Sequence, residues 1–150
     1  MTSLTATGEV AVPVAFGFHP YLRLPGVPRV EWVFEAPVHE RLVLDRRGLP
    51  TGAREPAAIE PGPLGARSWD DAFRAPAAGQ AFALVGPDRR LELRLDSGYP
   101  FTQIFAPDNL DAVAIEPMTA PTNALLTAGP ELTFVPPGES FAATFSISVL

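Results

Sequence analysis

The 150-residue sequence contains no cysteine, which excludes disulfide bonds and thiolate metal sites. It also contains no lysine: all 11 basic residues are arginines, and none forms a run longer than the pairs Arg46-Arg47 and Arg89-Arg90. With a formal net charge of −6, the chain lacks the basic surface that attracts nucleic acids or anionic membranes. We therefore expect neither a nucleic acid nor a membrane as a partner.

Long apolar runs and targeting signals are missing as well. No apolar stretch approaches the roughly 20 residues that a membrane-spanning helix needs. Residues 1–6 have neither the basic nor the apolar region of a signal peptide. These features lead us to expect a cytoplasmic protein.

Proline and glycine, in contrast, are abundant, with 18 and 12 residues. They are scattered so densely that few windows could hold a helix of ordinary length. The segments between them are short and rich in valine, leucine, phenylalanine and isoleucine, a pattern typical of all-β proteins. The length and the hydrophobic fraction of 47% are sufficient for one core. We predict a single all-β domain, an antiparallel β-sandwich over residues 1–150.

Turn residues and apolar runs divide the chain into expected strands. These are residues 4–10, 12–18, 30–34, 39–45, 67–74, 81–85, 91–95, 101–106, 112–116, 131–135 and 140–150. Gly86-Pro87-Asp88 predicts a hairpin turn. Residues 46–64 are interpreted as an irregular surface excursion, and residues 119–129 as a loop with one helical turn.

The segment 16–22 holds a histidine in a constrained setting. Strand-like alternation places His19 and Tyr21 on one face. Pro20 pushes His19 into an extended conformation and ends regular pairing. A rigidly held imidazole at a strand end is suited to proton transfer. Taken alone, however, this stretch favours a structural role over a catalytic one for His19: the histidine would cap a strand or satisfy a core hydrogen bond.

Glu116 occupies a similar setting, because it also ends an apolar run and immediately precedes a proline, Pro117. Alternation places Glu116 on one face with the small Ala112 and Ala114, which leaves room for a ligand above that face. An imidazole with a pKa of about 6.5 and a carboxyl with a pKa of about 4.3 can act as acid and base, if they flank opposite sides of one substrate. A solvated glutamate fits the pattern equally well.

Separated motifs in the sequence resemble those of the aldose 1-epimerases, or galactose mutarotases, in order and approximate spacing. They are residues 16–22 (Phe-Gly-Phe-His-Pro-Tyr-Leu), 70–73 (Asp-Asp-Ala-Phe), and 103–109 (Gln-Ile-Phe-Ala-Pro-Asp-Asn) followed by 114–117 (Ala-Ile-Glu-Pro). The resemblance implies a galactose mutarotase-like supersandwich. It also implies an isomerase that interconverts the α and β anomers of a hexose without a metal or cofactor.

The resemblance assigns a role to four polar residues. It makes His19 the general acid that protonates the sugar ring oxygen, and Glu116 the general base that takes the proton of the anomeric hydroxyl. Asp70 and Gln103 fall on positions that bind sugar hydroxyls in the family. Such hydrogen bonds would orient the substrate.

Aromatic residues near these motifs are candidates for a floor under the apolar face of the sugar. Tyr21, Phe105 and Trp69 are the candidates, and core packing is the alternative for Trp69 and Phe105. The sequence departs from the family pattern at Asp71, where histidine is usual, and at Phe105-Ala106, which replace a polar pair. We expect both departures to change which hydroxyls are recognised.

The resemblance extends over nearly the whole chain but matches only the second half of the family's domain. A further arginine and histidine of the family's site would precede His19 and have no counterpart here. The chain is therefore expected to be a truncated reading frame, a half-protein completed by self-association or by a partner chain, or a non-catalytic remnant. The other histidine, His39, is expected to be structural.

Three other functions stay open from the sequence. A non-catalytic carbohydrate-binding β-sandwich would use the same polar groups only to hold a sugar. A phosphosugar mutarotase would need a basic cluster, for which Arg23 and Arg74 are the candidates. A purely structural domain predicts that alanine at His19 or Glu116 changes only stability.

Overall fold

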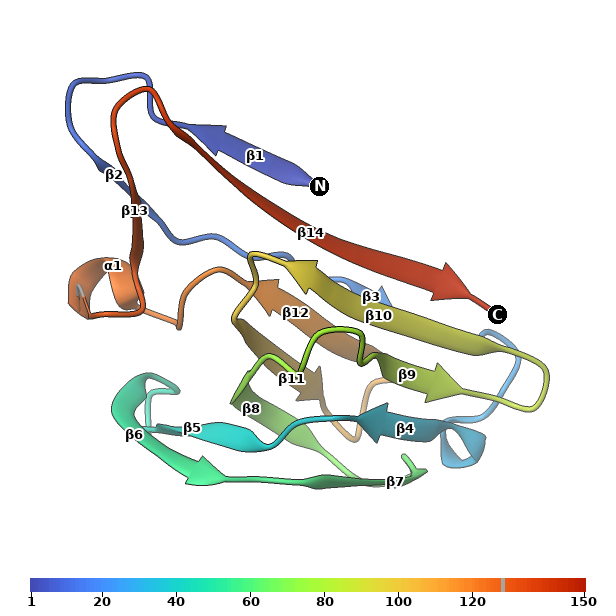
Figure 1. Cartoon of the computed structure of the whole chain (residues 1–150). Helices are drawn as coiled ribbons and strands as arrows, with labels where there is room; N and C mark the ends of the chain where they lie inside the picture. Colours follow the sequence, from blue (N-terminus) through green and yellow to red (C-terminus); the bar gives the residue numbers. More distant parts are fainter. Residues whose placement is uncertain (128) are drawn as a thin grey trace.

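Two antiparallel sheets stack face to face in the computed structural model, which describes residues 1–127 and 129–150 (Figure 1). Sheet I has the strand order β1-β14-β10-β9-β4-β7, and sheet II has the order β3-β12-β11-β8-β5-β6. The predicted antiparallel all-β sandwich is confirmed. No helix within the described residues is long and apolar enough to span a membrane.

The elements follow one another with short connections. They are β1 (Thr2–Thr5), β2 (Val12–Val14), β3 (Tyr21–Leu22), the 3-10 helix η1 (Arg29–Glu31), β4 (Val33–Ala36), β5 (Glu40–Leu44), β6 (Pro50–Pro56), β7 (Ile59–Pro63), β8 (Trp69–Arg74), β9 (Phe82–Val85), β10 (Arg90–Ser97), β11 (Phe101–Ala106), β12 (Val113–Met118), α1 (Ala124–Thr127), β13 (Thr133–Val135) and β14 (Ser140–Val149). The expected helical turn in residues 119–129 is α1.

The core lies between the two sheets because alternate residues of each strand turn inward. Phe34 and Phe82 fill it from sheet I, and Ile104, Val113 and Ile115 fill it from sheet II, all fully buried. Burying one such side chain contributes about 1.5–3 kcal/mol relative to leaving it exposed. The intervening residues of β8, β11 and β12 consequently face away from the core, and they form the floor of the candidate site.

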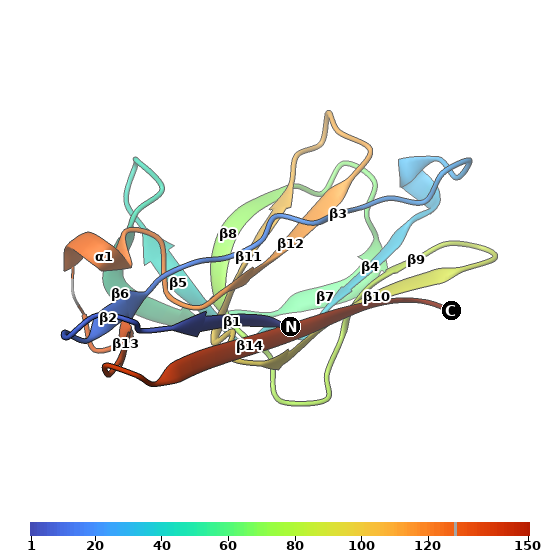
Figure 2. The same cartoon turned by 90° about the horizontal axis from the view of Figure 1, so that it is seen from above.

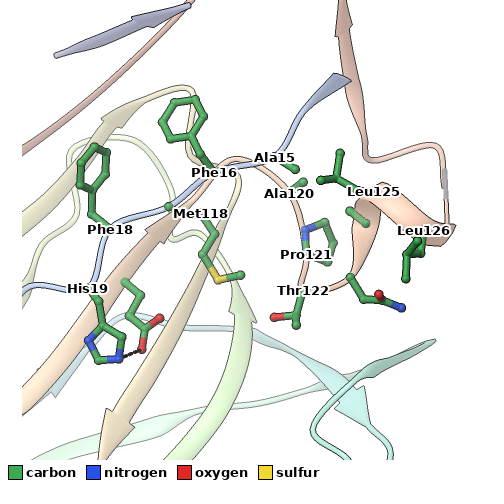
Figure 3. A pocket seen from close by; sticks show the side chains of 14 residues that line it. Ala15, Phe16, Phe18, His19, Met118, Ala120, Pro121, Thr122, Leu125 and Leu126 are labelled. Atoms are coloured by element: carbon green, nitrogen blue, oxygen red, sulfur yellow. Dashed lines mark ion pairs between the residues drawn. The ribbon is translucent and has the colours of Figure 1, made fainter. Parts of the chain in front are cut away.

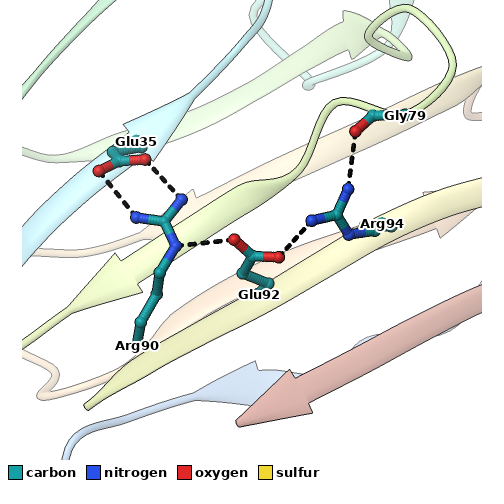
Figure 4. Close-up of polar contacts among 5 residues, drawn as sticks. All are labelled: Glu35, Gly79, Arg90, Glu92 and Arg94. Carbon is teal, nitrogen blue, oxygen red and sulfur yellow. Dashed lines mark hydrogen bonds and ion pairs between the residues drawn. The ribbon is translucent and has the colours of Figure 1, made fainter. Parts of the chain in front are cut away.

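The outer face of sheet I is polar. Glu35 accepts two hydrogen bonds from Arg90, at 3.0 and 2.8 Å, across the intervening strand β9 (Figure 4). Glu92 accepts one from Arg90 at 2.7 Å and one from Arg94 at 2.5 Å. This ladder of alternating charges occupies the face of the sandwich opposite to the candidate site.

Residues 46–64 are not a surface excursion, and that prediction is wrong. The segment forms β6 and β7, which are the edge strands of sheets II and I. An edge strand tolerates proline and glycine because one side of its backbone needs no ladder partner. Ile59 anchors β7, since its side chain is 9% exposed and belongs to the core.

The strands expected at the start of the chain are also shorter than predicted. Residues 4–10 and 12–18 yield only β1 and β2, and residues 30–34 are divided between η1 and β4. His19 therefore does not end a long strand: it lies in the irregular connection between β2 and β3. Strand β2 pairs with β13 in a separate two-stranded sheet, and Figure 2 shows this pair close to α1.

Candidate active site

His19 and Glu116 meet on the outer face of sheet II. Nε2 of His19 lies 3.0 Å from Oε1 of Glu116, and the two side chains are 47% and 18% exposed (Figure 3). The two side chains are therefore in direct contact here, and their placement on opposite sides of one substrate stays a prediction. An adjacent pair serves a reaction in which two neighbouring oxygen atoms exchange protons at the same time.

The backbone around Gly17 holds His19 next to β12. Gly17 forms an isolated bridge with Met118, and the amide of Phe18 donates to the carbonyl of Pro117 at 3.1 Å. Three further bonds join Phe16 to Thr119. The Phe16 amide donates to Oγ1 at 2.9 Å, and the Phe16 carbonyl accepts from the Thr119 amide at 2.9 Å and from Oγ1 at 3.0 Å. The irregular segment is therefore fixed to the strand that carries Glu116.

Burial changes the acidity of Glu116. Removal from water raises the pKa of this carboxyl above its ordinary value, His19 partly opposes the rise, and the nearby charge of Asp70 adds to it. A carboxylate with a raised pKa holds a proton more strongly than an ordinary glutamate. It is consequently a better general base.

Asp70 and Gln103 lie beside this pair. Nε2 of Gln103 donates to Oδ1 of Asp70 at 2.7 Å, and Gln103 is directly opposite Glu116 in the β11–β12 register. A cavity of about 360 Å³ is lined by these groups and the two catalytic candidates. This volume lies in the range of small-ligand sites, and the convergent carboxylate and amide suit a ligand with several hydroxyl groups.

Two of the three aromatic candidates line the cavity. The ring of Tyr21 stacks on the imidazole of His19 with centroids 4.6 Å apart, and Phe105 approaches the same imidazole edge-on at 6.1 Å. Trp69 does not contribute, because it faces the core side of β8, where it contacts Phe34 and the guanidinium of Arg67. For Trp69, the core-packing alternative is therefore the one that the structure shows.

Asp71 also points away from the cavity. Its Oδ1 accepts a hydrogen bond from Nη1 of Arg41 at 3.0 Å, on the side of β8 opposite to Asp70. Neighbouring residues of a strand face opposite sides of the sheet, so Asp71 cannot read hydroxyls bound beside Asp70. The other departure from the family pattern is Phe105-Ala106 in place of a polar pair. Phe105 lines the cavity, whereas Ala106 is buried in the core.

Sequence reasoning missed two residues of the cavity wall, Met118 and Thr122. Met118 has a sequence signal, since it is two residues beyond Glu116 on the same strand face. Thr122 follows β12 in the connection to α1, and no local pattern identifies it. Among the described residues, no group of three His, Cys, Asp or Glu side chains lies close enough together to hold a metal ion.

Arg74, one of the two candidates for binding the phosphate of a phosphosugar, forms ion pairs with acidic side chains. Nη1 of Arg74 donates to Oε1 of Glu131 at 3.2 Å, and its Nε lies 3.9 Å from Oε1 of Glu40. The guanidinium also packs over the ring of Phe101. These contacts do not favour phosphate binding by Arg74. The structure gives Arg23 no contact with the cavity, and His39 is exposed outside it.

Replacing Gly17 with alanine is expected to separate the acid and base groups. A Cβ atom at this position would lie 2.6 Å from the carbonyl oxygen of Pro117, so the segment that carries His19 must move away from β12. A displacement of this kind costs about 10- to 100-fold in turnover. The measurement is the rate of the catalysed reaction beside the melting temperature.

Gly8→Ala is the matched control, because nothing lies within 4 Å of a Cβ atom built there. It should leave both rate and melting temperature unchanged. A Gly17→Ala protein that keeps the full rate would show that the close approach of the two segments is irrelevant to the site.

Comparison with known proteins identifies relatives over nearly the whole chain. A profile of the aldose 1-epimerase family matches residues 2–148. The uncharacterized protein YihR of Escherichia coli is 24% identical over 147 residues, which cover 93% of this chain and 47% of YihR. The chain therefore spans about half the length of this curated relative.

Solved structures show the same fold. A galactose mutarotase-like protein from Clostridium acetobutylicum superposes with a TM-score of 0.85 at 15% identity, over 99% of this chain and 51% of that one. The GalM/aldose epimerase homologue from C. elegans gives a TM-score of 0.75 at 17% identity, over 96% of this chain and 53% of its own. These likenesses show the fold, and the match over residues 2–148 shows that the chain belongs to the aldose 1-epimerase family.

Proposed function

We propose that the protein is an aldose 1-epimerase, which interconverts the α and β anomers of a hexose by acid/base ring opening and reclosure. The observation that supports this most is the 3.0 Å contact of His19 with Glu116 next to Asp70 and Gln103 in one cavity. Membership of the family supports it as well.

Ring opening requires one proton to leave and another to arrive. The Glu116 carboxylate takes the proton of the anomeric hydroxyl while His19 gives its proton to the ring oxygen. The C1–ring oxygen bond breaks, and the electron pair of the anomeric O–H bond forms the carbonyl. Both oxygens are bonded to C1, which is why two groups in contact serve them better than two groups far apart.

Reclosure uses the same residues in exchanged roles. Rotation about the C1–C2 bond presents the other face of the carbonyl to the hydroxyl on C5. His19 takes the proton of that hydroxyl as the new C–O bond forms, and Glu116 returns its proton to the carbonyl oxygen. Each positioned proton transfer contributes about 10²- to 10⁴-fold to the rate.

The other polar residues orient the sugar. Asp70 accepts hydrogen bonds only, while the amide of Gln103 both donates and accepts, so together they match hydroxyls that do both. Tyr21 and Phe105 offer ring faces and edges to the apolar side of the sugar. Their positions suit a substrate held with its anomeric carbon towards His19 and Glu116.

Polarimetry on freshly dissolved α-glucose and α-galactose tests the proposal. Added protein should speed the decay of optical rotation to its equilibrium value beyond the rate in buffer. Binding of the sugars without acceleration would instead support a non-catalytic carbohydrate-binding sandwich. If the protein neither binds these sugars nor accelerates their interconversion, the result would oppose both functions.

The pH profile of the reaction is expected to report the raised pKa of Glu116. A general base must be ionised, so kcat/KM should fall as pH decreases through that pKa, at a higher pH than for an ordinary glutamate.

The variant Asp70→Asn tests what causes kcat/KM to fall at low pH, which is the acidic limb of the pH profile. Burial is the main reason for the raised pKa of Glu116, but the charge of Asp70 contributes. Removing that charge should move the acidic limb to lower pH, whatever it does to KM. An acidic limb that stays in place in Asp70→Asn would contradict the assignment of this limb to Glu116.

A further inference from the structure

His19 lies between two places where its segment is joined to β12. Before it, Gly17 forms an isolated bridge with the end of β12. After it, β3 pairs with the start of β12, where Tyr21 is the register partner of Ala114. Glu116 lies on β12 between these two joints. The position of the imidazole relative to the carboxylate therefore depends on both of them.

The first joint, between residues 16–18 and 117–119, lacks one donor of a regular antiparallel ladder. Pro117 accepts a hydrogen bond from the Phe18 amide but has no amide hydrogen with which to return one. The Phe16 amide donates across the joint to a side chain, Oγ1 of Thr119, at 2.9 Å. A hydroxyl thus supplies an acceptor where a regular ladder uses a backbone carbonyl.

The Thr119 hydroxyl makes two of the four hydrogen bonds that the structure gives this joint. Besides accepting from the Phe16 amide, it donates to the Phe16 carbonyl at 3.0 Å. The other two bonds run from the Thr119 amide to that same carbonyl and from Phe18 to Pro117. Thr119 is 2% exposed, so water has little access to compete for the hydroxyl. A buried hydroxyl that both donates and accepts holds its partner residue in a single register.

Aromatic packing also holds Phe16, but in a different way. Its ring meets Tyr99 and Phe141 edge-on, with centroids 6.1 and 6.3 Å apart. Such contacts keep the segment against the sandwich, yet they direct its backbone less strictly than hydrogen bonds do. Removing the Thr119 hydroxyl should consequently loosen the first joint without detaching it.

We infer that Thr119 is a positioning residue for the acid/base pair: its hydroxyl fixes the register of residues 16–18 on β12 and thereby holds His19 against Glu116. This role rests on the proposed function, because only a reaction that uses both groups depends on their 3.0 Å contact. Thr119 is not among the residues that line the polar cavity, so it acts through His19 and not on the sugar.

The change Thr119→Val removes the hydroxyl at nearly constant volume. The value of kcat should fall about 10- to 100-fold, which is the cost of a small misplacement of a reacting group. KM should change little, because Asp70 and Gln103 are untouched. Thr119→Ser keeps the hydroxyl and should retain most of the rate. In the matched control Thr102→Val kcat should not change, since Thr102 is also buried but its hydroxyl donates to the neighbouring carbonyl of Gln103.

The pH profile distinguishes a positioning role from a purely structural one. The titratable groups around Glu116 are His19, Tyr21 of β3 and Asp70 of β8, and His19 partly opposes the rise of the Glu116 pKa. When His19 moves away in Thr119→Val, that pKa should rise further, and the acidic limb of kcat/KM should move to higher pH. A purely structural loss would lower the rate and leave the limb in place.

Amide hydrogen exchange followed by NMR tests the joint without any sugar. In Thr119→Val the amides of Phe16 and Phe18 should exchange about tenfold faster, as expected for the loss of one or two hydrogen bonds. The amides of β11 should keep their protection. Unchanged exchange at Phe16 and Phe18 would show that the hydroxyl does not hold the joint, and would overturn the inference.

The remaining outcomes separate this inference from the proposed function. If the unmodified protein accelerates neither α-glucose nor α-galactose, the proposed function fails and the positioning role fails with it. If the unmodified protein is active and Thr119→Val keeps its kcat and its acidic limb, the function stands and the inference is overturned. Equal losses in Thr119→Ser and Thr119→Val would also overturn it. So would a Thr119→Val protein that does not fold, because the hydroxyl would then maintain the whole fold and not one joint.

Discussion

Replacing Glu116 with glutamine is expected to lower the rate of anomer interconversion by about 10²- to 10⁴-fold, which is the contribution of one positioned proton-transfer group. The amide is nearly the same size as the carboxyl and keeps a contact with Nε2 of His19 possible. It cannot take the proton of the anomeric hydroxyl, however. The rate should be measured with saturating sugar, so that a change in binding does not mask the loss of turnover.

The same substitution should leave the protein as stable as before or more stable at neutral pH. Since the folded-state pKa of Glu116 is raised above its unfolded value, ionising this group opposes folding at every pH above that pKa. The glutamine variant removes the buried charge, and its advantage should disappear at pH values below both pKa values. Loss of activity together with unchanged or higher melting temperature would exclude misfolding as the cause.

Glu9→Gln is the matched control for Glu116→Gln, because Glu9 is exposed in the connection between β1 and β2. It should change neither rate nor stability. A Glu116→Gln protein with more than half of the original rate would contradict the role of the carboxylate as general base.

The second large effect is expected at His19. The change His19→Asn should reduce the rate by about 10²- to 10⁴-fold, because the proposed mechanism assigns the proton transfer to the ring oxygen to this imidazole. The side chain is 47% exposed, so the fold should lose little beyond the stacking on Tyr21. The double variant with Glu116→Gln should be about as slow as the worse single variant, since residues that act as a unit are not additive.

His39→Asn is the control for this prediction, as His39 is exposed and outside the cavity. If the effects of His19→Asn and Glu116→Gln instead multiply in the double variant, the two residues act independently. That result would oppose the concerted proton exchange proposed above.

Period-two alternation was sufficient to predict most strands of the two sheets. It also separated inward from outward residues on β12, where Val113 and Ile115 are in the core and Glu116 is at the site. Alternation failed at residues 46–64, because proline and glycine suggested a loop where edge strands tolerate them. Whether a proline-rich segment pairs depends on its place in the sheet, which the local sequence does not contain.

The contact between His19 and Glu116 could not be predicted from either segment alone. It depends on the bridge between Gly17 and Met118, which joins parts of the chain far apart in sequence. The same applies to Thr122, which reaches the cavity through the path of a loop. Alternation from Asp70 places Trp69 and Asp71 together on the inward face of β8, which favours core packing for Trp69 and excludes Asp71 from contact with hydroxyls beside Asp70.

Catalysis of anomer exchange by this chain through His19 and Glu116 can be measured by NMR exchange spectroscopy on an equilibrium mixture of α- and β-hexose, with the His19→Asn/Glu116→Gln double variant as background. We expect exchange cross-peaks that grow with the concentration of the unmodified protein and stay at the buffer rate with the variant. Equal exchange rates for the two proteins, at concentrations where both bind the sugar, would contradict this expectation.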